Sequence, residues 1–167
     1  MKKSGLIWLV MGAMEFVAAC KSDGQSASTQ TFTLASTGAD LTVKVTASIP
    51  SSWTVEKTPD TINFKVPGID NILPCVSIVS ISPHARGEAE RLAKVIGYQF
   101  VATPNAKRED LPDGRVWMSD VNDRNVHARM FIPYEGGVVM GIAMCMKDAE
   151  KKLPEIRKVL DTIKVVK

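Results

Sequence analysis

The feature that most restricts the fold is a series of three long segments joined by very short turns. Residues 115–121, 126–134 and 138–146 are predicted as β-strands from their apolar alternation. Only residues 122–125 and 135–137 separate them. Connections this short force neighbouring strands to run antiparallel. The sequence therefore predicts an antiparallel meander in its C-terminal half.

Further strands are predicted on the N-terminal side of this meander. Residues 41–49 alternate apolar and polar side chains as far as Pro50, as a half-buried strand does. Residues 62–66 do the same up to Pro67. Residues 75–81 are apolar on both sides, which indicates a central strand, and 106–110 form a weaker candidate.

Two segments have helical periodicity instead. One covers residues 88–100, and the other begins near Pro154, since proline is accepted only in the first helical turn. The apolar faces consist of Ala89, Leu92, Ile96 and Phe100 in the first helix, and Ile156, Val159, Leu160 and Ile163 in the second. The expected fold class is α+β, an antiparallel sheet of about six to seven strands packed with two helices.

The start of the chain has the composition of an export signal. A positively charged beginning precedes an apolar stretch over residues 5–14, too short for a spanning helix of about 20 residues. Residues 17–20, Val-Ala-Ala-Cys, resemble the bacterial lipobox, in which the cysteine is acylated after cleavage before it. We therefore predict a lipoprotein signal peptide over 1–19 and lipidation of Cys20, although Glu15 is unusual in such a segment.

Several acyl chains on one residue anchor a protein firmly, because each buried CH₂ contributes about 0.8 kcal/mol. Lys21 follows the lipidated cysteine, whereas retention in the inner membrane of enteric bacteria usually requires aspartate there. The lipobox resemblance therefore implies a periplasmic domain tethered to a membrane, the outer membrane rather than the inner one. The alternative is an ordinary signal peptide whose cysteine is incidental.

The mature chain divides into a linker and one domain. Residues 21–31 are small and polar, so 20–31 is expected to be the acylated cysteine with a flexible linker, and 32–167 a single α+β domain. Loss of 1–19 removes two lysines and one glutamate, so the formal charge falls from +3 to +2. This balance, with no run of basic residues, excludes a nucleic-acid-binding stripe.

The layout resembles a known fold. The features that carry the resemblance are Cys20, the polar linker, the Ile49-Pro50-x-x-Trp53 corner, the helix with Arg91-Leu92-Ala93-Lys94, the meander and the final helix. Together they resemble the PsbP-like fold and, within it, the DcrB-type bacterial envelope lipoproteins, over nearly all of 32–167. The resemblance implies a binding module, docking partner or chaperone without a catalytic set. Related folds also serve type VI secretion as effector chaperones and as periplasmic immunity lipoproteins.

Two cysteines remain in the mature chain besides Cys20. Cys75 and Cys145 lie in predicted strands, and an even number suits an oxidising compartment. Cys145 shares a strand face with Ala143, opposite the face of Met144. A disulfide between Cys75 and Cys145 and two buried thiols are both compatible with the sequence, because strand adjacency decides the geometry.

Motifs for metal binding and catalysis are missing from the sequence. His84 and His127 are its two histidines, and no spacing supplies the three or four ligands that zinc requires. Residues 120–125 lack the central glycine and terminal glutamate of a calcium loop, and there is neither a nucleophile elbow nor a phosphate loop. We predict no cofactor, no metal and no enzyme, with a small hydrolase kept as a minor alternative because triads are recognised by geometry.

Charged residues gather in two predicted turns. They are either solvated hairpins or an acidic lip for a basic protein partner. A tryptophan on the strand between the turns is either core, if a helix covers it, or a binding hot spot, if it is uncovered. The candidate partner-binding residues are Glu109, Asp110, Asp113, Trp117, Asn122, Asp123 and Arg124.

These observations predict a monomeric, membrane-anchored periplasmic binding protein without catalytic activity. The leading hypothesis is an immunity protein that binds and inhibits a type VI secreted cell-wall-degrading effector, because the expected compartment and the resemblance both fit it. The alternative is a DcrB-type housekeeping envelope lipoprotein that acts as a docking or assembly factor. In either case the partner is a protein, the membrane is reached through the lipid, and nucleic acid is not bound.

Overall fold

The computed structural model describes residues 26–69, 78–88, 90–91, 94 and 106–166. They form two antiparallel sheets against which a C-terminal helix packs, so the predicted α+β class is confirmed. The smaller sheet has the order β1-β2-β10 and consists of β1 (Ala27–Ala35), β2 (Thr42–Pro50) and β10 (Lys164–Val166).

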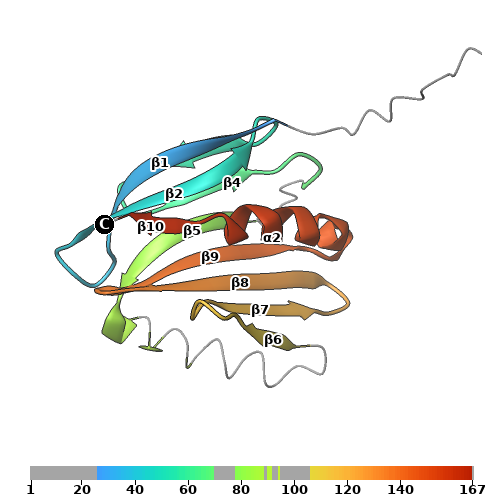
Figure 1. The fold of residues 1–167 in the computed structure, drawn as a ribbon. Coiled ribbons are helices and arrows are strands. Elements are labelled where there is room, and N and C mark those ends of the chain that lie inside the picture. Colours follow the sequence, from blue (N-terminus) through green and yellow to red (C-terminus); the bar gives the residue numbers. More distant parts are fainter. Residues whose placement is uncertain (1–25, 70–77, 89, 92–93, 95–105, 167) are drawn as a thin grey trace, which may run out of the picture.

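The larger sheet has seven strands in the order β3-β4-β5-β9-β8-β7-β6, and β7, β8 and β9 form the predicted meander (Figure 1). Its strands are β3 (Thr54–Lys57), β4 (Ile62–Lys65), β5 (Ile78–Ala85), β6 (Lys107–Asp110), β7 (Val116–Val121), β8 (Asn125–Tyr134) and β9 (Gly137–Met146). A 3-10 helix, η1 (Lys147–Lys152), leads into α2 (Leu153–Asp161).

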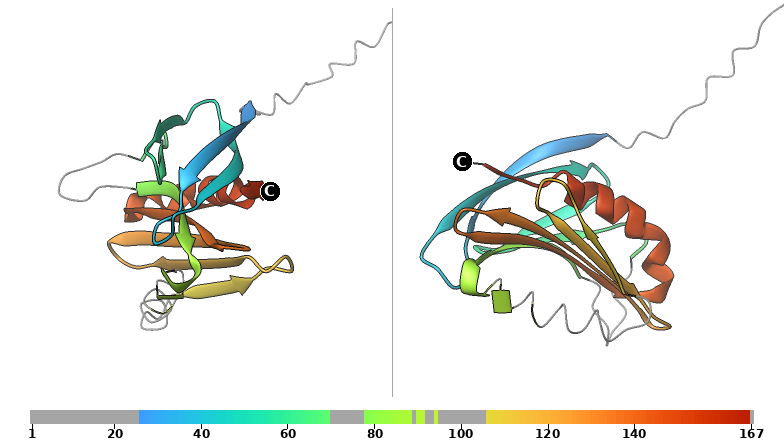
Figure 2. Two further views of the ribbon diagram at one scale, coloured as in Figure 1. Left: turned by 90° about the vertical axis from the view of Figure 1, so that its left-hand side faces the viewer. Right: turned by 60° about the horizontal axis from the view of Figure 1, so that its bottom comes forward.

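The main core lies between the smaller sheet and one face of the larger sheet. Figure 2 shows the smaller sheet and α2 on the same side of the larger sheet. Leu34 and Val45 of the smaller sheet, Ile156 and Leu160 of α2, and Met130 of β8 are all fully or almost fully buried there. One face of each layer is thus removed from water, which is the main favourable contribution to folding.

The final helix agrees with the sequence prediction. Pro154 lies in its first turn, and the predicted apolar face is buried, both within α2 and at Ile163 just beyond its end. Trp53 donates a hydrogen bond from Nε1 to Oε1 of Glu155 at 2.9 Å, and its ring lies 5.7 Å from that of Phe64. The Pro-x-x-Trp corner therefore belongs to the core and fixes the start of α2.

The helix predicted over 88–100 lies mostly outside the described residues. Residues 86–88, 90–91 and 94 are helical. No helix in the described part of the chain has the length and apolar character needed to cross a membrane.

The linker predicted over 20–31 extends too far. β1 begins at Ala27 and pairs with β2 along its whole length, from Ala27 opposite Pro50 to Ala35 opposite Thr42. The small polar side chains at 27–31 bury little, but the backbone ladder to β2 holds them in a strand. Composition describes the side chains, whereas the ladder is formed by the backbone. Composition alone therefore did not predict the start of this strand.

Two glycines of β9 permit the close approach of its neighbours. A Cβ at Gly137 would overlap the carbonyl oxygen of His84 on β5, which is backbone and cannot move aside. A Cβ at Gly141 would come within 2.7 Å of Cδ2 of Leu160, a flexible side chain on α2. Gly137 begins the strand and Gly141 lies inside it, and at both positions the absence of a side chain explains glycine.

We expect Gly137→Ala to destabilise the fold by about 3 kcal/mol, because the strand pair must separate to admit the methyl group. Gly141→Ala should cost about 1–2 kcal/mol, since Leu160 can change rotamer. The measurement is the free energy of unfolding in urea. Gly87→Ala is the control, because a Cβ there meets nothing within 4 Å. Equal stability of the Gly137→Ala and Gly87→Ala variants would contradict the packing described.

Candidate binding groove

The predicted acidic lip is not a continuous surface. The turn that carries Asp113 precedes β7, and the turn that carries Asp123 follows it. Six strand residues at about 3.3 Å each separate the two turns by about 20 Å. They therefore lie at opposite ends of one strand and do not form one continuous lip.

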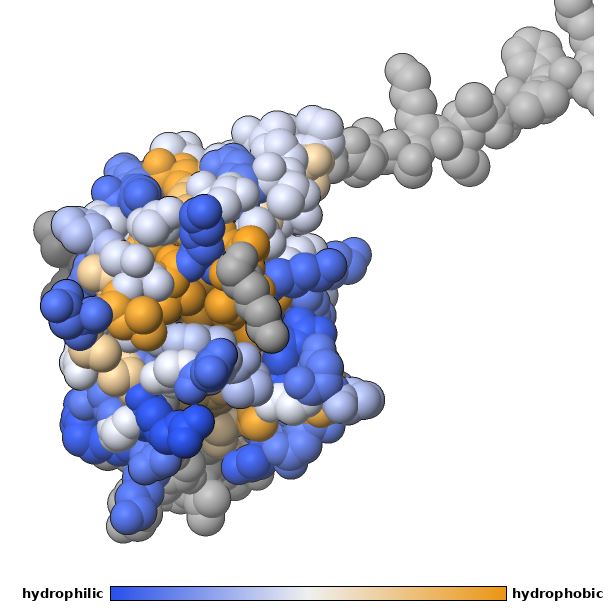
Figure 3. All heavy atoms as spheres, turned by 60° about the vertical axis from the view of Figure 1, so that its left-hand side comes forward, coloured by the Kyte–Doolittle hydropathy of each residue, from blue (hydrophilic) through white to orange (hydrophobic). Residues whose placement is uncertain are grey.

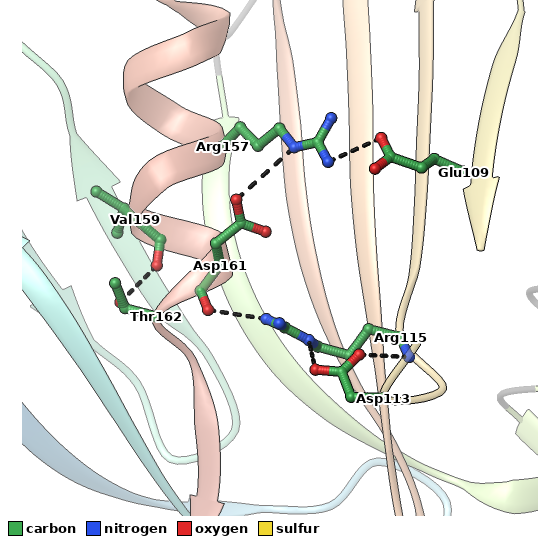
Figure 4. A network of polar contacts seen from close by, with 7 residues as sticks. All are labelled: Glu109, Asp113, Arg115, Arg157, Val159, Asp161 and Thr162. Carbon is green, nitrogen blue, oxygen red and sulfur yellow. Dashed lines mark hydrogen bonds and ion pairs between the residues drawn. The ribbon is translucent and has the colours of Figure 1, made fainter. Parts of the chain in front are cut away.

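The carboxylates of this lip are also paired within the protein. Asp110 accepts a hydrogen bond of 2.8 Å from Nη2 of Arg108, and this bond lowers the pKa of Asp110. Glu109 lies 2.8 Å from Nη2 of Arg157, an ion pair that joins β6 to α2 (Figure 4). The surface is a balanced array of both signs, not an acidic one.

Asp113 belongs to a second set of contacts at the end of α2. Its Oδ2 accepts a hydrogen bond of 2.6 Å from Nε of Arg115. The Nη1 of Arg115 in turn donates to the backbone oxygen of Asp161 at 2.8 Å, as Figure 4 shows. A helix C-terminus leaves carbonyl oxygens without intrahelical partners, and an arginine is well suited to one of them. Asp113 therefore orients the arginine that caps α2.

The residues of the other turn have a local structural role. Oδ1 of Asn122 accepts hydrogen bonds of 2.9 Å from the backbone nitrogens of Arg124 and Asn125. This is an Asx turn, which closes the hairpin between β7 and β8. Asp123 and Arg124 are exposed at its tip. Their exposure fits the solvated-hairpin interpretation, which the sequence had left open.

Trp117 is part of the core. Its side chain is 4% exposed, and the guanidinium carbon of Arg157 on α2 lies 5.0 Å from the centre of its ring. Of the two roles left open by the sequence, the structure assigns the structural one, because α2 covers this position. Trp117 is not accessible as a hot spot in this structure.

Trp117→Ala should therefore lower the free energy of unfolding by about 3–5 kcal/mol, the usual cost of a large cavity. Asp123→Ala, at an exposed turn tip, should change it by no more than about 0.5 kcal/mol. Chemical denaturation followed by tryptophan fluorescence and circular dichroism measures both. A Trp117→Ala variant as stable as the parent would contradict the buried position.

The cysteine prediction is only partly covered by the described residues. Cys145 is buried and forms no disulfide with a described residue, and burial together with the nearby Asp148 raises the pKa of its thiol to about 11. A thiol in this state is protonated at neutral pH and reacts slowly. Cys75 lies outside the described residues, so its proposed pairing with Cys145 stays a prediction.

A serine and a histidine of β5 lie within hydrogen-bond distance of each other, the arrangement that the minor alternative of a small hydrolase requires. Oγ of Ser82 and Nε2 of His84 are 2.9 Å apart, but both residues are buried. Nδ1 of His84 has no hydrogen-bond partner among the described residues, so no acid orients the ring as a triad requires. Nor do the described residues contain a group of three or more histidine, cysteine, aspartate or glutamate side chains that could hold a metal ion.

Burial lowers the pKa of His84, although Glu88 and Asp60 partly oppose the shift, and burial also lowers that of His127. The unfolded chain therefore takes up more protons than the folded chain below the ordinary histidine pKa near 6.5. We expect the free energy of unfolding to be highest above pH 6.5 and to fall as the pH drops below it. His84→Asn should make this decline shallower in urea titrations, and an unchanged slope would contradict the prediction.

An apolar groove lies at the other end of the molecule from the start of β1. Its volume is about 510 Å³. Two of the exposed large apolar residues in the described part of the chain lie in it, Leu41 with 43% of its surface exposed and Val166 with 41%. Figure 3 shows an apolar patch on the face where the chain ends. The lining residues are Leu41, Thr42, Val43, Lys44, Pro133, Tyr134, Glu135, Gly136, Val165 and Val166.

Three elements shape the groove. β10 and the beginning of β2 form one wall, and the turn between β8 and β9 forms the other. Tyr134 is held in that second wall by its hydroxyl, which lies 3.1 Å from Oγ of Ser36 and donates to the backbone oxygen of His84 at 3.4 Å. A Cβ at Gly136 would come within 2.8 Å of Leu41, so glycine lets the two walls approach.

Sequence reasoning missed this groove. The alternating pattern places Leu41 on a strand face, and the helical pattern places the C-terminal residues at a helix end. Neither pattern predicts that these residues lie together. The adjacent β-branched pair Val165 and Val166 was a signal of a short strand after α2. The meeting of β10 with the β8–β9 turn is a tertiary contact that no local pattern could show.

The chain matches no protein-family model, no curated protein and no solved structure.

Proposed function

We propose that this chain is a membrane-anchored periplasmic binding protein without catalytic activity, and more specifically an immunity protein that inhibits a type VI secreted cell-wall-degrading effector. The observation that supports binding is the apolar groove, with Leu41 and Val166 exposed in it and Lys44 and Glu135 at its rim. Exposed apolar surface rimmed by charged residues is characteristic of interaction sites.

The described residues favour binding over catalysis. Ser82 and His84 form the pair most like a nucleophile and its base, but they are buried and the ring lacks a partner at Nδ1. A catalytic serine must be reached by substrate and its base must be oriented. The groove contains no such pair, while its apolar walls can bury a partner's side chains.

The sequence supports the location in which such a protein would act. The lipobox-like residues 17–20 and the resemblance to DcrB-type envelope lipoproteins together suggest a tether at Cys20. An inhibitor of a cell-wall-degrading enzyme must be in the periplasm, where its target acts. A lipid anchor keeps it there at high local concentration, which favours rapid capture of an incoming effector.

Lipidation is tested by the incorporation of radiolabelled palmitate. We expect the wild-type chain to be labelled and the Cys20→Ala variant to remain unlabelled, because the thiol is the acylated group. Cys145→Ala is the matched control, since that thiol is buried and should not affect labelling. Equal labelling of wild type and Cys20→Ala would exclude a lipid anchor at this residue.

Immunity is tested by contact competition between a strain deleted for this protein and its parent. The deleted strain should lose at least tenfold in survival, and a plasmid copy should restore it. A parent strain without a working type VI apparatus is the control and should cause no loss. Equal survival with the active parent would exclude immunity, and a defect that does not depend on contact would favour the alternative of a housekeeping DcrB-type lipoprotein.

A further inference from the structure

We propose that the groove binds an extended segment of a partner protein, which adds a strand to the open edge of β10. The inference deepens the proposed function and relies on it for the partner's location, the periplasm. The recognition itself depends on three features of the described residues: an open strand edge, an apolar wall beside it, and charged residues on the rim.

Among the described residues β10 pairs with β2 on one side only, so its other edge is open. Lys164 lies opposite Thr46, and Val166 lies opposite Lys44. Alternate residues of an edge strand direct their N–H and C=O groups away from the partner strand, and these groups can pair with an added strand.

The edge of β10 differs from the outer edge of the larger sheet at β6. The four residues of β6 are all charged, and Arg108 and Asp110 pair with each other. Charged side chains are a common means of preventing an edge from pairing with another chain. β10 lacks this protection at its two valines, and the groove places an apolar wall beside it.

The apolar wall beside β10 favours an added strand in which apolar and polar side chains alternate. A segment aligned with β10 would direct every second side chain towards Pro133, Tyr134 and the exposed side chain of Leu41, and the others towards solvent. Apolar residues are therefore favoured at alternate positions. Backbone pairing then contributes affinity, and the wall contributes specificity.

The rim adds a preference for charge. Lys44 is exposed and lines the groove on the β2 side, and Glu135 lines it on the opposite wall. Lys164 lies at a smaller hollow that shares Pro133 with the groove. Lys44 favours an acidic residue near the end of the bound segment that lies beside it, whereas Lys164 adds no such preference because Asp113 and Asp161 line the same hollow.

The position of the groove argues against its being filled by the chain's own N-terminal segment. β1 starts opposite Pro50, and its far end, at Ala35 opposite Thr42, adjoins the groove. The nine residues of β1 span about 30 Å, whereas the seven residues from Cys20 to Ser26 extend at most about 24 Å. The mature N-terminus therefore cannot fill the groove.

The test starts from the full chain purified in mild detergent and a library of phage-displayed twelve-residue peptides. Enriched peptides should alternate apolar and polar residues and carry acidic residues near an end. Leu41→Asp and Val166→Asp should each weaken binding of a synthetic enriched peptide at least tenfold. Met144→Asp is the matched control, because Met144 is also an exposed apolar residue but lies outside the groove, and it should leave binding unchanged.

Backbone methylation separates strand pairing from other modes of binding. In the synthetic peptide, N-methylation at every second residue should reduce affinity at least tenfold, and methylation of the other set should have little effect. A helical or purely side-chain-bound peptide does not show this period of two. Absence of enrichment, loss of the period, or equal binding by the Leu41→Asp and Met144→Asp variants would each overturn the proposal.

Two further readouts identify a different occupant. Self-association of the full chain that Val166→Asp abolishes would show that a second copy fills the groove. Binding of a fluorescent fatty acid that Leu41→Asp abolishes, without peptide binding, would indicate a lipid. Either result rejects the partner strand. Because the peptide assay uses no effector, its failure is distinct from failure of the competition assay, which reports on immunity alone.

Discussion

The burial of one face of the larger sheet is the constraint on which the rest of the structure depends. The main core lies on one face of this seven-stranded antiparallel sheet, and α2 and the smaller sheet together remove that face from water. Gly141 of β9 allows α2 to approach closely, since its bare Cα faces Leu160. The chain then leaves α2 and pairs β10 with β2, which joins the helix to the smaller sheet.

The groove follows from this arrangement. Because β10 is short and joins the smaller sheet at its edge, its outer side lies beside the turn between β8 and β9. Tyr134 keeps that turn in place through its bonds to Ser36 and the backbone of His84. The exposed apolar residues are thus held by a rigid frame, which limits the ordering cost of binding a partner.

The charged residues that looked like a binding surface serve α2 instead. Arg115 caps the helix end at Asp161, and Arg157 joins Glu109 to the helix while lying over Trp117. Exposed ion pairs contribute little stability one by one. Their joint effect is to fix the direction in which the chain leaves α2, and that direction places β10. Residues of charge-rich turns can therefore contribute to a site that lies elsewhere.

The sequence by itself determined the local elements. Alternation and short turns were enough for β2, β4, β7, β8 and β9, and Pro154 with its apolar face was enough for α2, because these signals act between residues close in the chain. It could not show β1, whose polar side chains conceal a backbone ladder, or choose between the two roles of Trp117. Only the tertiary structure decided those points and created the groove, since each depends on which distant segments meet.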